Sequence, residues 1–161
     1  MADLGLVRVD YRLIHGQVIA KWLKQIQADK IIVINDNLAK DSFMQKVYKM
    51  AVPPSVTVQI IDLSTALSKW KENNMGEGKI LLLFKDVETA VKAWEGGITY
   101  STLQVGGLGG GPGRKPIYKN VSLSDDDFNL LNKLSNQDVN IIFQAIPEEK
   151  PMEFKKITAK M

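Results

Sequence analysis

Apolar and polar residues alternate along this chain with two periods, one typical of β-strands and one typical of α-helices. Short apolar runs at 31–34 and 80–84 have the length of buried strands. Between such runs, apolar residues recur every three or four positions, as they do from Val18 to Ile26, which indicates helices with one buried face. The predicted strands cover 4–9, 31–34, 56–61, 79–84, 102–105 and 139–146, and the predicted helices cover 16–26, 39–51, 64–73, 87–94 and 124–134.

Local signals support the ends of two of these helices. Pro53 and Pro54 end the second helix, because proline lacks an amide donor and restricts the residue before it. Ser124 and Asp127 resemble a capping box that opens the last helix. Strands that alternate with helices are typical of an open, mostly parallel sheet with helices on both faces. We therefore predict a single doubly wound α/β domain over 1–161, with its ligand site beyond the carboxyl ends of the strands.

The composition is that of an ordinary folded protein, and it removes several kinds of chemistry. The chain has 161 residues, of which 45% are hydrophobic and 24% charged, so one core is expected. Cysteine is absent, which excludes disulfides, thiolate nucleophiles and cysteine-bound metals. The net charge is +3 without a long basic block, so no nucleic-acid partner is expected. The longest apolar runs fall short of the roughly 20 residues that cross a bilayer, and no secretory signal is visible, which favours a cytoplasmic location.

The loop between the first predicted strand and helix concentrates chemically useful side chains. It holds Arg8, Asp10, Arg12 and the only histidine of the chain, His15. The amides of a helix amino terminus attract anions, and arginine forks match phosphate oxygens, so this loop can bind a phosphate group. A neutral imidazole is also a nucleophile when a carboxylate holds one ring nitrogen, and Asp10 is a candidate for that role. The alternative is that the histidine only caps the loop and that Arg8 only pairs with Asp10.

Several familiar reactions do not fit this loop. Histidine phosphatases and phosphoglycerate mutases use an Arg-His-Gly motif with a second histidine, whereas here Ile14 precedes His15 and no second histidine exists. The Gly-x-Ser-x-Gly motif of serine hydrolases is absent. No His-x-x-x-His or similar spacing supplies a zinc site, so neither a metal nor a cofactor is expected.

The segment from Val7 to Val18 reads Val-Arg-Val-Asp-Tyr-Arg-Leu-Ile-His-Gly-Gln-Val. It closely resembles the amino-terminal motif of enzyme IIB components of the mannose/fructose/sorbose class of bacterial sugar phosphotransferase systems, and chain length and element order are similar too. The resemblance implies a phosphotransferase that takes a phosphoryl group from the phosphohistidine of a IIA protein. It passes that group to a sugar during uptake through the membrane subunits IIC and IID, at the inner face of the membrane. The resemblance leaves open which sugar is transported and whether the protein forms a homodimer.

The resemblance also suggests a role for each side chain of the loop. His15 matches the phosphorylated residue, which in this family is expected to react through Nδ1. Asp10 then cannot occupy Nδ1 in the reactive state, and it is expected to hold Arg12 or Arg8. Arg12 would stabilise the phosphoryl oxygens, and Arg8 is a further candidate from the strand.

The amides around Gly16 and Gln17 would bind the same phosphoryl oxygens, so that fixed positive groups replace a metal ion. Gly16 would also let a partner approach closely. A different class of function uses the same groups: a non-enzymatic α/β module that senses a phosphorylated metabolite without forming a covalent adduct. The formation of an adduct on His15 separates these two hypotheses.

The glycine-rich run 106–113 does not match either standard phosphate-binding motif, because no Gly-x-Gly-x-x-Gly frame fits and Arg114 intervenes before Lys115. We expect either a flexible turn or a flap near the site, with Arg114 and Lys115 available to a sugar phosphate or a partner. The run weakly resembles IIB sequences for amino sugars such as N-acetylgalactosamine. The basic tail 151–161 is expected to dock on the domain, pair with another subunit or fray. Core packing is expected for the large apolar side chains on helices, with the methionines also suited to a partner surface; these are Trp22, Phe43, Met44, Tyr48, Met50, Trp70 and Trp94.

Overall fold

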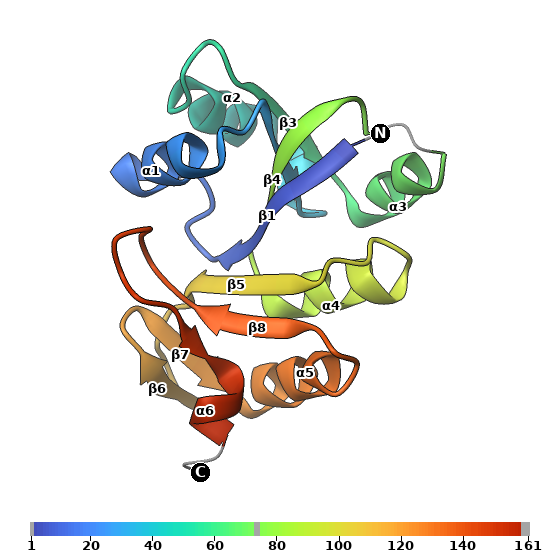
Figure 1. Ribbon diagram of the computed structural model, residues 1–161. Helices are drawn as coiled ribbons and strands as arrows, with labels where there is room; N and C mark the ends of the chain where they lie inside the picture. Colours follow the sequence, from blue (N-terminus) through green and yellow to red (C-terminus); the bar gives the residue numbers. More distant parts are fainter. Residues whose placement is uncertain (1, 73–74, 159–161) are drawn as a thin grey trace.

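Strands and helices alternate in the structure, a computed structural model that describes residues 2–72 and 75–158 (Figure 1). The strands are β1 (Ala2–Asp10), β2 (Lys30–Ile34), β3 (Thr57–Ile61), β4 (Gly78–Phe84), β5 (Thr102–Gly107), β6 (Arg114–Tyr118), β7 (Val121–Ser124), β8 (Asn140–Phe143) and β9 (Met152–Glu153). The α-helices are α1 (Gly16–Ile26), α2 (Ser42–Met50), α3 (Leu63–Lys71), α4 (Val87–Glu95), α5 (Asp125–Ser135) and α6 (Phe154–Thr158), and a 3-10 turn covers Leu38–Lys40.

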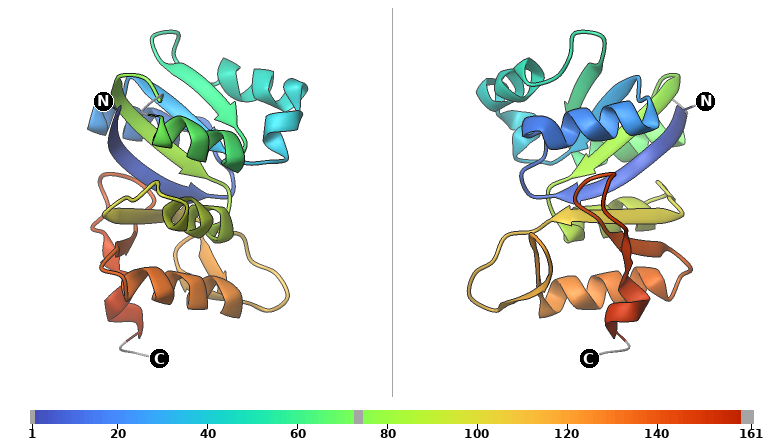
Figure 2. Two further views of the ribbon diagram at one scale, coloured as in Figure 1. Left: turned by 90° about the vertical axis from the view of Figure 1, so that its right-hand side faces the viewer. Right: turned by 60° about the vertical axis from the view of Figure 1, so that its left-hand side comes forward.

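Seven strands form the main sheet in the order β3-β2-β4-β1-β5-β8-β9. All neighbouring strands in it are parallel except the short β9, which is antiparallel to β8. Helices α1 and α2 lie on one face of this sheet, and α3, α4 and α5 lie on the other (Figures 1 and 2). The prediction of a mostly parallel, doubly wound α/β fold is therefore confirmed.

The central strands are buried on both faces, which explains why their sequences are continuous apolar runs. Alternate side chains of β2 and β4 point to opposite faces, as the period of a strand requires. One set packs with α1, and the other packs with α3, α4 and α5. The first set includes Ile31, Val33, Leu81 and Leu83, and the second includes Ile32, Ile34, Ile80, Leu82 and Phe84.

The helix predicted over 39–51 is shorter than expected. Asp41 accepts a hydrogen bond from the amide of Met44 and is the N-cap of α2, so the residues before it form a separate 3-10 turn. The side chains of α2 also correct a prediction. Phe43 is 71% exposed and Met50 is 85% exposed, whereas Met44 and Tyr48 are partly buried. The helix thus has two apolar sides, and only the side with Met44 and Tyr48 faces the sheet.

The three tryptophans pack as predicted. Trp22 of α1 is buried in the core on that face of the sheet, and Trp70 and Trp94 are partly buried in the core on the opposite face. The strand predicted over 139–146 ends at Phe143, and the chain beyond it forms a loop that reaches α1 (Figure 2). The tail docks on the domain through β9 and α6, where Phe154 is buried, and its last residues, 159–161, lie outside the described residues.

The two-stranded sheet β6-β7 was not predicted. It is an antiparallel hairpin that follows the glycine-rich run, with Asn120 in the left-handed region (φ 51°) at its turn. Val121 and Leu123 bury one face of the hairpin in the core shared with α5. The hairpin therefore fixes the glycine-rich run from its far end.

Candidate functional site

The loop of interest lies where the sheet changes its winding direction. β1 is flanked by β4 on one side and β5 on the other, and the helices that follow β1 and β4 lie on opposite faces. Ligands bind at such switch points in open α/β sheets, beyond the carboxyl ends of the strands. The residue pairs Arg8 with Gln104 and Asp10 with Gly107 join β1 to β5 at this end.

Asp10 is the centre of the site. Its carboxylate is completely buried and receives both Nε (3.0 Å, to Oδ1) and Nη2 (3.0 Å, to Oδ2) of Arg12. Nη2 of Arg8 and Nε2 of His15 both lie 3.2 Å from Oδ2. Burial alone would raise the pKa of this carboxyl, but the hydrogen bonds from Arg12 and the charges of both arginines outweigh it and lower the pKa. Asp10 is therefore held as an anion that faces the histidine.

His15 is the N-cap residue of α1, with an extended backbone (φ −147°, ψ 135°). Its side chain is 23% exposed and makes no capping hydrogen bond. Because Nε2 faces Oδ2 of Asp10, this contact favours the tautomer with the proton on Nε2. Nδ1 has no hydrogen-bond partner within the described part of the chain, so its lone pair is available.

The first residues of α1 are open to solvent beside His15. Gly16 and Gln17 are exposed, and a Cβ on Gly16 would meet nothing within 4 Å. Gly16 has a φ of +48°, in the left-handed region that other residues rarely adopt. Glycine is thus needed here for the backbone conformation, while the space above it stays free for a ligand or partner.

Arg12 lies at the edge of the site, with its side chain 31% exposed. Its bidentate contact with Asp10 raises the pKa of the guanidinium. The guanidinium also lies over the ring of Tyr11, 5.6 Å from the ring centroid. Nη1 makes no hydrogen bond to the described residues and remains a donor for an anion.

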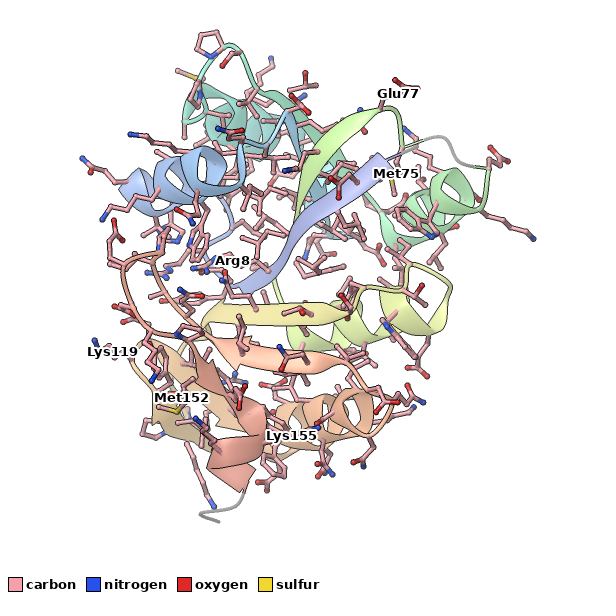
Figure 3. All side chains as sticks on the ribbon, in the orientation of Figure 1. Arg8, Met75, Glu77, Lys119, Met152 and Lys155 are labelled. Atoms are coloured by element: carbon pink, nitrogen blue, oxygen red, sulfur yellow. The ribbon has the colours of Figure 1, made fainter. Side chains whose placement is uncertain are left out.

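Arg8 has a different environment. Only 1% of the residue is exposed, and it lies at the carboxyl end of β1 (Figure 3). Its Nη1 donates to the side-chain Oε1 of Gln104 and to the carbonyl of Gln144 (2.9 Å), and Nη2 also donates to the carbonyl of Ala145 (3.1 Å). Burial lowers the pKa of Arg8, although Asp10 partly opposes this effect. The geometry places Arg8 against Asp10, with its side chain away from the surface.

Two glycines of β5 make room for these charged groups, and this function was not predicted. A Cβ on Gly106 would lie 2.0 Å from Nη2 of Arg8. A Cβ on Gly107 would lie 2.8 Å from both Nη2 of Arg12 and Oδ1 of Asp10. The start of the glycine-rich run is therefore part of β5 and packs against the site. The sequence did not reveal this, because Gly106 and Gly107 begin a run of glycines that is typical of a loop.

Arg114, a further candidate from the glycine-rich region, is engaged elsewhere. Arg114 donates to the carbonyls of Gly109 and Ser122 and pairs with Asp127 at 2.8 Å, so it fastens the hairpin to α5. Within residues 2–72 and 75–158, no group of three or more His, Asp or Glu side chains is arranged to hold a metal ion. None of the helices in that part of the chain has the length and apolar character needed to span a membrane.

Comparisons with known proteins identify the family of this chain. The family model for the "PTS system sorbose subfamily IIB component" matches residues 4–161. A crystal structure described as manxB from Thermoanaerobacter tengcongensis is 37% identical, with a TM-score of 0.93, and the match covers 99% of this chain and 97% of that one. The sorbose-specific EIIB component of Lacticaseibacillus casei is 33% identical over 143 residues, which are 89% of this chain and 87% of that protein.

The chain also matches longer proteins. It is 25% identical over 158 residues to the mannose-specific EIIAB component of Escherichia coli strain K12, a match that covers 98% of this chain. It spans about half the length of that relative, since the match covers 49% of it. On the evidence of the family model and these relatives, the chain belongs to the sorbose-subfamily IIB components of the sugar phosphotransferase systems.

Proposed function

We propose that this protein is a phosphoryl carrier whose acceptor is Nδ1 of His15. It takes a phosphoryl group from the phosphohistidine of a IIA partner and gives it to a sugar hydroxyl. The observation that carries this proposal is the contact of 3.2 Å between Nε2 of His15 and Oδ2 of Asp10, which leaves Nδ1 free on an exposed edge. When one protonated nitrogen of an imidazole is held in this way, the lone pair of the other nitrogen is free to attack.

The surroundings of Nδ1 suit a phosphoryl group. Arg12 is anchored to Asp10 by two hydrogen bonds and still offers donors toward solvent. The amides of Gly16 and Gln17 open α1 next to His15 and carry the positive end of the helix dipole. These fixed positive groups would stabilise the equatorial oxygens in the transition state. We assign Arg8 to holding Asp10, because its guanidinium is buried and bonded on several sides.

The proposed transfer moves the phosphoryl group from one imidazole nitrogen to another. The lone pair of Nδ1 attacks phosphorus as the N–P bond of the donor phosphohistidine breaks, and the donor imidazole, protonated on its other nitrogen, leaves neutral. His15 keeps its proton on Nε2, so the phosphorylated ring is cationic and faces the carboxylate of Asp10. In the second transfer, a sugar hydroxyl oxygen attacks phosphorus, its proton passes to a base of the acceptor complex, and Nδ1 regains its lone pair.

The partners follow from the family. We propose a IIA protein or domain as donor, and membrane subunits IIC and IID that present the sugar, so that the carrier works at the cytoplasmic face of the membrane. Relatives are described as specific for mannose, sorbose, fructose or N-acetylgalactosamine, so the family leaves the sugar open.

Intact-mass measurement tests this proposal. The protein is incubated with phosphoenolpyruvate, the general phosphocarrier proteins and a IIA partner. We expect the mass of one phosphoryl group to be added, to be lost in acid, and to be absent in His15→Ala. A His15→Ala protein that is labelled as fully as the natural chain would refute the assignment. Tight, reversible binding of phosphate without any adduct would instead support the anion-sensing hypothesis.

A further inference from the structure

We propose that Gln104 is a positioning residue for phosphoryl transfer, which acts through Arg8 and Asp10 to hold His15 in its reactive tautomer. The expected effect of Gln104 on the transfer rate rests on the proposed function, whereas its expected effect on the tautomer of His15 does not. Gln104 does not touch His15. It contacts Arg8, which in turn contacts Asp10, the carboxylate that faces His15.

The position of Gln104 supports this role. It is paired directly with Arg8 across the β1–β5 ladder, and only 1% of it is exposed. Its Oε1 accepts a hydrogen bond from Nη1 of Arg8, and its Nε2 donates to Oε1 of Gln144 at 3.3 Å. Both ends of the amide are therefore used, and neither can rotate without losing a partner. A buried amide with this pattern has one preferred orientation.

The acceptors around Arg8 come from three separate parts of the fold. Gln104 belongs to β5, the carbonyls of Gln144 and Ala145 belong to the loop after β8, and Asp10 ends β1. A buried guanidinium is costly unless its donors are satisfied, so these contacts fix the plane of the Arg8 side chain. That plane decides whether Nη2 reaches Oδ2 of Asp10, the oxygen that faces His15.

Neighbouring groups close this arrangement from the other sides. The ring of Trp22 stacks on the guanidinium, 5.4 Å from centroid to Cζ, and its Nε1 donates to the carbonyl of Ala145 at 2.9 Å. Nε2 of Gln144 donates to the carbonyl of Glu149 at 2.8 Å and ties down the same loop. Without Gln104, Arg8 would lose this side-chain amide contact, and its guanidinium would tilt toward the loop carbonyls, away from Asp10.

Two substitutions separate the effect of the acceptor from that of shape. Gln104→Met keeps the length of the side chain and removes the acceptor, whereas Gln104→Glu keeps an acceptor for Arg8. Tyr100→Phe is the matched control. Tyr100 is also buried and lies just before β5, and the substitution removes its hydrogen bond of 2.7 Å to the carbonyl of Ala90, away from the site.

The readout is the tautomer of His15, followed by ¹⁵N NMR at a pH where the imidazole is neutral. The chain has one histidine, so ¹⁵N-histidine labelling gives the signals of His15 alone. We expect the Nε2-protonated form to dominate in the natural chain, in Tyr100→Phe and in Gln104→Glu. We expect a mixture of both tautomers in Gln104→Met, with the rate of transfer from phosphorylated IIA lowered roughly tenfold because the nucleophile is misplaced.

Three results would overturn this proposal. One is a folded Gln104→Met protein with the tautomer and transfer rate of the natural chain. Another is the same loss in Tyr100→Phe, which would mean that general destabilisation moves the imidazole. If Gln104→Met does not fold, Gln104→Glu decides: a folded variant with mixed tautomers would show that the acceptor is not what matters. Failure of the natural chain to accept phosphate would refute the proposed function, and the tautomer comparison would still stand.

Discussion

Gly106→Ala is the smallest change that should disturb the site. The new methyl group would lie 2.0 Å from Nη2, 2.1 Å from Cζ and 2.5 Å from Nη1 of Arg8, which is closer than real Cβ contacts allow. The backbone of Gly106 is not in the left-handed region, so alanine is not strained by its own conformation. The effect of the substitution therefore falls on the guanidinium, which must leave its position.

The size of the effect follows from what the guanidinium would lose. Displacement of Arg8 breaks its contact with Asp10 and leaves charges buried without full partners, which costs roughly 3–5 kcal/mol. Alanine in a strand offsets about 0.5–1 kcal/mol of this cost relative to glycine, because an alanine residue loses less conformational freedom on folding. We therefore expect the free energy of unfolding to fall by roughly 2–4.5 kcal/mol, together with a clear loss of phosphoryl transfer.

Urea unfolding at neutral pH and the rate of phosphorylation by a IIA donor measure the two effects. Gly109→Ala is the matched control in the same run, because its Cβ would lie 3.7 Å from the ring of Tyr11, an ordinary contact. We expect this control to keep the stability and rate of the natural chain. If Gly106→Ala were as stable and as active as Gly109→Ala, the account of how Arg8 is held would be refuted.

Three further predictions concern Arg12, Asp10 and Met50. Arg12→Ala should lower the transfer rate about a hundredfold, measured by rapid-quench kinetics. It should lower the free energy of unfolding by only about 1–2 kcal/mol, measured by urea unfolding. An unchanged transfer rate would remove Arg12 from the site. Asp10 has a pKa below its unfolded value, so its contribution to stability is present above about pH 4 and is lost as pH falls through the folded pKa. Asp10→Asn should therefore show a shallower loss of stability in acid than the natural chain, and equal slopes would contradict this. Met50→Ser should change the unfolding free energy by less than about 0.5 kcal/mol, because Met50 is 85% exposed, and a larger loss would mean that α2 is buried in solution.

The sheet could be predicted because its strands differ so clearly from the helices in period. The runs that contain Ile32 and Leu82 are apolar at every position, as strands covered on both faces must be. The hairpin was missed because β6 begins with Arg114, Lys115 and Pro116, which do not alternate between apolar and polar. Its stability comes from Val121 and Leu123 on the partner strand, which is a tertiary effect.

Prediction of helix α2 failed at the level of side chains. Phe43, Val47 and Met50 share one side of this short helix, while Met44 and Tyr48 share another. Both sides are apolar, so periodicity alone cannot choose which one meets the sheet. The choice depends on how the helix is attached after Asp41.

The residues of the site itself were within reach of the sequence because they are close together along the chain. Arg8, Asp10, Arg12 and His15 lie within eight positions at the end of one strand. Gln104 was not, because it is separated from Arg8 by 96 positions and meets it only when β1 and β5 pair. From the sequence, Arg12 was expected to stabilise the phosphoryl oxygens and Arg8 was a further candidate for that role. The burial of Arg8 supports our proposal that it holds Asp10 instead.

The most direct test of the central claim is NMR of the phosphorylated protein labelled with ¹⁵N-histidine. The single histidine gives one pair of ring nitrogens to observe. We predict that phosphorus is coupled to Nδ1 of His15 through one bond, and that Nε2 keeps its proton toward Asp10. A phosphoryl group bonded to Nε2, or a stable label on another residue, would contradict the account.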